Sequence, residues 1–174
     1  EYEVYLALGS LEAPHSTPEL LTYLLERPSE EIERALWELT GRGLLTREIR
    51  QTQLPAAQAL KPDLVSIIAG ANDLLMRRWN PDQFETDFAA MLGAFPTRTE
   101  RLTMTLPNFS IPLGMPATMR ARFERQWVQA NDIIRRLARR HDALLLDVGA
   151  NMDFHHADVW SADRVHPNAR GYAQ

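Results

Sequence analysis

Three short apolar runs, separated by stretches with helical periodicity, constrain this chain more than any other feature of its sequence. The runs span residues 64–69, 102–106 and 143–148, and the first two end at Gly70 and Pro107. Continuous apolar strands that alternate with helices are typical of an α/β protein with a parallel sheet and right-handed crossovers. We therefore expect ligands to bind beyond the carboxyl ends of these strands, as they do in other open parallel sheets.

The helices between these strands have clear boundaries and apolar faces. Asn80-Pro81-Asp82 predicts a helix start, because Asn is a favoured cap and Pro is favoured at the first helical position. Residues 107–116 contain three prolines, which predicts an irregular loop. Apolar residues at helical spacing predict one helix before this loop and a longer one after it. The residues concerned are Phe84, Phe88, Met91, Leu92 and Phe95 in the first helix, and Phe123, Trp127, Ala130, Ile134 and Leu137 in the second.

Three polar residues are candidates for chemistry. Asn72 follows the first strand, where a side-chain amide would reach the expected ligand edge. Asp163 precedes His166 by three residues, and Pro167 favours an extended backbone at His166. Imidazole titrates near neutral pH and is therefore suited to act as a base. The alternative interpretations are a helix cap at Asn72 and a surface turn around His166.

Two sequence blocks resemble those of the SGNH (GDSL-type) serine hydrolases. They are Gly70-Ala71-Asn72-Asp73 and Ser161-Ala162-Asp163-Arg164-Val165-His166-Pro167-Asn168. Residues 53–57 and 61–65 also resemble the approach to the Asn block, so the resemblance covers about residues 41–174. It implies a three-layer, flavodoxin-like α/β fold and hydrolysis of ester or acyl substrates without a metal or cofactor. It also implies that Asp163 and His166 are the acid and base of a triad and that Asn72 is an oxyanion donor.

The nucleophile block is the incomplete part of this resemblance. Gly9-Ser10-Leu11 resembles the family's Gly-Asp-Ser-Leu block with its Asp deleted. Ser10 would then be the nucleophile, and its backbone N–H would join the oxyanion hole. Arg42-Gly43 resembles the family's glycine block, which implies that the Gly43 N–H is a further oxyanion donor. A loop serine at residue 10 and a simple turn at residue 43 remain the alternatives, in which case the protein is an inactive hydrolase scaffold.

The first 48 residues also resemble a winged-helix transcription regulator. The resemblance rests on residues 1–8, 34–39 and 43–45, and it implies helices over 2–8, 17–25 and 29–40 with a wing strand over 44–49. Residues 1–48 would then form one segment and residues 49–174 the hydrolase-like domain. In the alternative, Tyr5–Leu8 is the first strand of the hydrolase. The ten Glu and five Arg of residues 1–50 argue against DNA as a partner, because cations supply most affinity for phosphates.

Composition narrows the remaining classes of function. The chain has no cysteine, which excludes disulfides and thiol catalysis. Its net charge of -4 gives no general reason to expect nucleic acid or an anionic membrane as a partner. The resemblance to the hydrolases implies a small ester or acyl substrate instead. The cluster of Asp153, His155, His156 and Asp158 lacks a recognisable ligand spacing, so we expect no metal. No apolar run is long enough for a membrane span, and no signal peptide is seen at the start of the sequence, which begins at Glu1 and not at Met. We therefore expect a cytoplasmic protein.

Overall fold

The computed structural model of the protein describes residues 5–6, 45–76, 78–148, 156–160 and 168–172. Its centre is a parallel sheet with the strand order β1-β2-β3-β4. The strands are β1 (Tyr5–Leu6), β2 (Leu64–Ile67), β3 (Glu100–Met104) and β4 (Leu144–Leu146). The helices are α3 (Thr46–Ala59), α4 (Ala71–Leu75), α5 (Pro81–Leu92), α6 (Ala117–Arg140) and α8 (Ala169–Tyr172), with a 3-10 turn at Ala157–Val159. The α/β class and the parallel sheet predicted from the sequence are confirmed.

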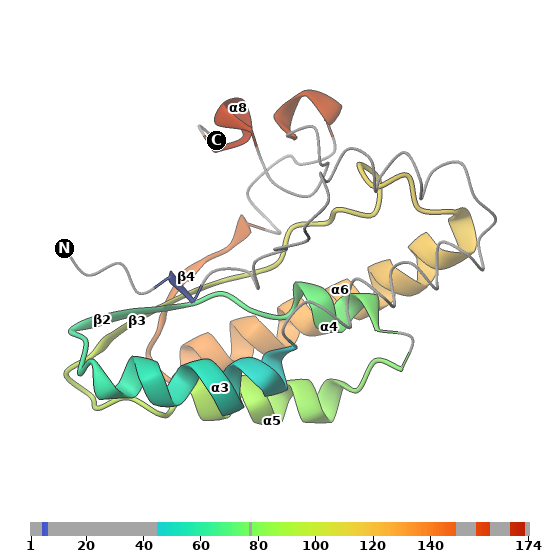
Figure 1. Cartoon of the computed structure of the whole chain (residues 1–174). Coiled ribbons are helices and arrows are strands. Elements are labelled where there is room, and N and C mark those ends of the chain that lie inside the picture. The colour runs from blue at the N-terminus through green and yellow to red at the C-terminus, as the bar shows by residue number, and fades with distance from the viewer. Residues whose placement is uncertain (1–4, 7–44, 77, 149–155, 161–167, 173–174) are drawn as a thin grey trace.

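The three long helices α3, α5 and α6 lie together on one side of the sheet (Figure 1). Strand residues that point toward these helices are buried, as Val65 and Ile67 show with no exposed surface. Their neighbour Leu64 is 56% exposed, and in β4 Leu144 is 60% exposed. Burial along β2 therefore alternates, with Val65 and Ile67 buried, Ser66 partly buried and Leu64 exposed.

Helix α5 begins where the sequence predicts. The Asn80 side chain accepts a hydrogen bond from the Gln83 N–H at 3.1 Å, and Pro81 occupies the first helical position. All five apolar residues predicted for this face are buried in the core, as are Phe123, Ala130, Ile134 and Leu137 of α6. Helical periodicity therefore identified the core correctly in both helices.

Strand β3 ends two residues earlier than expected. The run 102–106 predicts a strand to residue 106, whereas β3 ends at Met104. Leu106 instead bonds through both its N–H and its C=O to the side chain of Asn131 in α6. A helix side chain thus takes the place of a neighbouring strand at this position.

The beginning of the hydrolase region differs from the winged-helix interpretation. Residues 46–49, expected in a wing strand, form the first turn of α3, and Ile49 is buried in the core. A domain boundary after residue 48 would fall inside this helix. At residues 5–6 the structure has a strand, β1, which pairs with β2 in parallel, as in the alternative that begins the sheet there. The other expected N-terminal helices lie outside the described residues.

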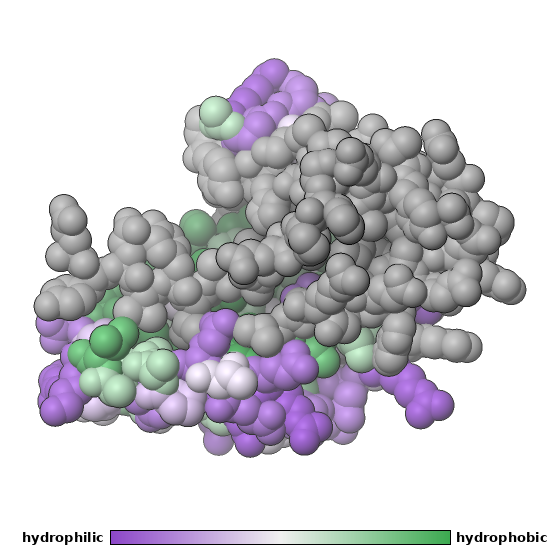
Figure 2. Space-filling view, viewed as in Figure 1, coloured by the Kyte–Doolittle hydropathy of each residue, from purple (hydrophilic) through white to green (hydrophobic). Residues whose placement is uncertain are grey.

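The visible surface of the helical layer is mostly hydrophilic (Figure 2). An apolar patch interrupts it where α3 ends and β2 begins, and the chain there contributes the exposed side chains of Leu60 and Leu64. Among the described residues, no helix combines the length and the apolar character that crossing a membrane requires.

Candidate active site at the carboxyl edge of the sheet

Strands β2, β3 and β4 run in the same direction, so their carboxyl ends share one edge of the sheet, here called the carboxyl edge. The turn that leaves β2 at this edge requires glycine at position 70. Gly70 has a φ of +113°, in the left-handed region that L side chains rarely adopt. A Cβ atom at this position would lie 2.7 Å from the Cε2 atom of Phe84 and 3.3 Å from a methyl group of Leu106. This close packing places the first turn of α4 directly against the ends of β2 and β3.

Asn72 is the second residue of α4 and is partly buried. The sequence left open whether Asn72 and Asp73 cap the helix that follows them. Both residues lie within α4, whose cap position is occupied by Gly70 and receives no side-chain hydrogen bond. The pair therefore does not serve as the N-cap of α4.

Asp73 caps a different helix. Its Oδ2 atom accepts the backbone N–H of Thr46 at 2.9 Å and the Thr46 hydroxyl at 2.7 Å. Thr46 is the first residue of α3, and the preceding Leu45 has no polar side chain with which to cap that helix. Asp73 thus satisfies, from 27 residues away, the first N–H group of α3, which an N-cap side chain would leave unpaired because it accepts from the second or third helical residue.

The environment of Asp73 is unfavourable for a charge. Burial raises the pKa of its carboxyl from 3.8 to about 6, although the hydrogen bonds from Thr46 oppose this rise. Desolvation disfavours the ionised form of a carboxyl group, whereas donors directed at it favour that form. The carboxyl therefore titrates close to neutral pH, immediately beside Asn72.

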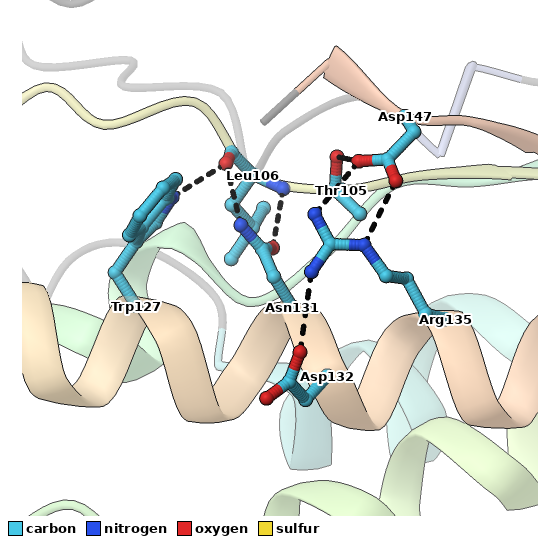
Figure 3. A network of polar contacts seen from close by, with 7 residues as sticks. All are labelled: Thr105, Leu106, Trp127, Asn131, Asp132, Arg135 and Asp147. Carbon is cyan, nitrogen blue, oxygen red and sulfur yellow. Dashed lines mark hydrogen bonds and ion pairs between the residues drawn. The ribbon is translucent and has the colours of Figure 1, made fainter. Parts of the chain in front are cut away.

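The chain that leaves β3 at this edge is held by α6 (Figure 3). The Asn131 side chain accepts the Leu106 N–H at 2.8 Å and donates to the Leu106 C=O at 3.0 Å. The indole N–H of Trp127 donates to the same carbonyl at 2.6 Å. These bonds fix the backbone of Leu106, whose side chain also packs against Gly70.

A charged network holds the chain that leaves β4 (Figure 3). Arg135 of α6 donates through Nε and Nη2 to the two carboxylate oxygens of Asp147, at 2.8 and 2.9 Å. The Thr105 hydroxyl donates to Asp147 at 2.9 Å, and Arg135 also contacts Asp132. The Asp147 carboxylate raises the pKa of Arg135 further, so the guanidinium stays charged. The network ties the ends of β3 and β4 to one helix.

Near the C-terminus, Asn168 joins two segments of the chain. Its Nδ2 group donates to the carbonyls of Asp158 and Trp160 at 2.8 and 2.9 Å. Its Oδ1 atom accepts the N–H groups of Arg170 and Gly171 at 2.9 and 3.1 Å, which caps α8. The Asn168 N–H also donates to the carbonyl of Val159. Residues 158–160 and 168 are thereby held together as one clamp, here called the Asn168 clamp.

The structure describes one of the five residues predicted for the catalytic site. Asn72 lies at the carboxyl edge, as expected of a residue that follows β2. Ser10, Gly43, Asp163 and His166 lie outside the described residues. Trp160 is buried. Within the part of the chain that the structure describes, no three His, Asp or Glu side chains gather as metal ligands would.

The long-range roles of Asp73 and Asn168 do not follow from the sequence patterns. Asp73 caps α3, and Asn168 joins residues 158–160 to α8. The available signals were the non-capping Leu45 before a helix and an Asn directly before a short helical turn. Neither signal identifies a partner distant in the sequence.

The sequence profile of the GDSL-like lipase/acylhydrolase family matches residues 8–174, and the chain therefore belongs to that family. No match is found among curated proteins. Among solved structures, the chain resembles LAE5, described as an alpha/beta hydrolase enzyme from the metagenome of Lake Arreo, Spain. The TM-score is 0.57 with 24% identity, over 90% of this chain and 76% of LAE5, which shows a shared fold.

Proposed function

We propose that this protein hydrolyses esters or related acyl compounds by a serine mechanism at the carboxyl edge. The observation that best supports this is the position of Asn72. It lies in the first turn of α4, directly after β2, and follows Gly70, a position with no room for a side chain. A side-chain amide held in such a turn can donate to the oxyanion of a tetrahedral intermediate. One donor of this kind stabilises the transition state by roughly 3 kcal/mol.

In this mechanism Ser10 is the nucleophile. His166 removes the proton of the Ser10 hydroxyl while the serine oxygen forms a bond to the substrate carbonyl carbon. His166 then returns the proton to the leaving alcohol as the ester C–O bond breaks. Water, activated by the same histidine, hydrolyses the acyl-serine. Asp163 orients His166 and stabilises its protonated form.

Three donors serve the oxyanion in this proposal. They are the side-chain amide of Asn72 and the backbone N–H groups of Gly43 and Ser10. Ser10 follows β1 by four residues, and Gly43 precedes the first residue of α3 by three. Strand β1 pairs with β2, which leads to Asn72, and the first residue of α3 bonds to Asp73, the neighbour of Asn72. These contacts support the participation of Ser10 and Gly43. The absence of an Asp directly before Ser10 favours the alternative, in which this protein is a family member without a competent nucleophile.

A fluorophosphonate probe tests the proposal directly. Mass spectrometry should locate the label on Ser10, and Ser10→Ala and His166→Ala should both abolish it. Hydrolysis of p-nitrophenyl acetate should fall about 100-fold or more in Asn72→Ala. Asn80→Ala is the matched control, because it removes an Asn that caps α5, outside the turn that carries Asn72, and should leave turnover unchanged. A folded wild-type protein that takes no label and hydrolyses no ester would overturn the catalytic proposal.

A further inference from the structure

The hydrogen bonds between Asp73 and Thr46 connect α4, which follows β2, to the start of α3. Asp73 is adjacent to Asn72 in α4, so any movement of its backbone moves Asn72 as well. Thr46 is fully buried and offers both of its donors to a single carboxylate oxygen. The first turn of α3 and the turn that carries Asn72 are therefore locked in one relative position.

This arrangement is costly for a helix cap alone. A Ser or Asp at position 45 would cap α3 locally, through the N–H of Arg47 or Glu48, with no distant carboxylate taken out of water. Here the carboxylate is partly buried, and its desolvation disfavours ionisation. Natural proteins tend to retain locally unfavourable arrangements where function requires them. The cost becomes understandable if the relative position of α3 and Asn72 matters for activity.

We propose that Asp73 is a positioning residue, which acts through its two hydrogen bonds with Thr46 to hold Asn72 in register with the start of α3. This inference rests on the proposed function, in which Asn72 and the chain just before α3 both donate to the oxyanion. Oxyanion donors must be placed to within a fraction of an ångström, and a displacement of about 1 Å can reduce the rate about 100-fold. The link therefore acts on turnover more than on substrate binding.

Four variants separate positioning from simple stabilisation. Thr46→Val keeps the shape and the backbone N–H but removes the hydroxyl donor, whereas Thr46→Ser keeps both donors. Asp73→Ala removes the acceptor altogether. The control is Asp87→Asn, because Asp87 is a buried carboxylate that also holds α3. It pairs with Arg50 of α3 at 2.8 Å and accepts a hydrogen bond from Gln83, whereas it acts on Asp73 through its charge, which raises the pKa of that carboxyl. The variants are therefore compared at a pH well above the pKa of Asp73, where its carboxyl is ionised with or without the charge of Asp87.

We expect kcat for p-nitrophenyl acetate to fall about tenfold in Thr46→Val and further in Asp73→Ala, with KM changed less than twofold. Thr46→Ser and Asp87→Asn should retain the wild-type kcat. A second measurement does not depend on activity: the side-chain amide signal of Asn72 in a ¹H–¹⁵N spectrum, assigned with Asn72→Ala. That signal should shift in Thr46→Val and not in Asp87→Asn.

Two results would overturn the inference. One is a folded Thr46→Val protein with wild-type kcat and an unshifted Asn72 signal. The other is an Asp87→Asn protein that loses as much kcat as Thr46→Val, since a general loosening of α3 would then explain both. If the wild-type protein hydrolyses no ester, the proposed function fails, and the Asn72 signal alone decides whether Asp73 and Thr46 position that residue. If Asp73→Ala does not fold, Thr46→Val still tests the inference, because it preserves the packing volume.

Discussion

The Asn168 clamp should contribute far more to stability than its place beside a four-residue helix indicates. Replacing Asn168 with Ala removes four side-chain hydrogen bonds, two to carbonyls and two from the first N–H groups of α8. Loss of an Asn cap costs about 1 kcal/mol, and each remaining bond contributes about 1 kcal/mol. We therefore expect Asn168→Ala to lower the free energy of unfolding by about 3 kcal/mol.

Asn80→Ala is the matched control for this measurement. It makes the same chemical change at another helix cap, but Asn80 accepts only the Gln83 N–H. Its expected cost is about 1 kcal/mol. Urea unfolding with linear extrapolation gives both free energies, and a change in midpoint without a change in slope identifies a loss of stability.

The clamp also joins the two ends of the segment 161–167, which contains Asp163 and His166. At a temperature where both variants are folded, fluorophosphonate labelling should therefore be slower in Asn168→Ala than in Asn80→Ala. The reasoning is refuted if the two substitutions cost the same free energy of unfolding. In that case the bonds to the carbonyls of Asp158 and Trp160 contribute nothing measurable.

Three further predictions concern the carboxyl edge. Because the pKa of Asp73 is raised, its contribution to stability is fully present below pH 3.8 and is lost as the pH rises through about 6; Asp73→Asn should remove this dependence, worth up to about 3 kcal/mol, from the pH profile of urea unfolding. Gly70→Ala should destabilise the protein by about 3 kcal/mol in thermal or urea unfolding, since it adds backbone strain and a clash with Phe84; a loss below about 1 kcal/mol would contradict the packing described for this turn. Arg135→Met should cost about 1–3 kcal/mol, because it leaves the half-buried Asp147 without its cation, and the double variant with Asp147→Asn should recover part of that loss in a mutant cycle.

Local sequence patterns predicted the elements whose stability comes from their own residues. The Asn80-Pro81 start of α5 and the apolar faces of α5 and α6 were read correctly, because capping and helical periodicity are local properties. The parallel sheet followed from the alternation of strands and helices. The position of Asn72 at the carboxyl edge followed in turn from the parallel sheet.

Long-range contacts explain what the sequence did not predict. Helix α3 has few large apolar residues and contains Pro55, and its first N–H group, that of Thr46, bonds to Asp73, far away in the sequence. The end of β3 was placed too late because the apolar residue Leu106 continues the strand pattern while its backbone bonds to Asn131. No periodicity within either segment encodes these partners.

The hydrogen bonds between Asn131 and Leu106 have a consequence for the substitutions that position 131 can accept. The side chain must present a donor and an acceptor together, in a site with 1% of the residue exposed. Asp lacks the donor, Leu lacks both groups, and Gln carries the amide one methylene further from the backbone. In a saturation library selected for folded protein, this interior helix position should therefore tolerate fewer residue types than the apolar positions around it.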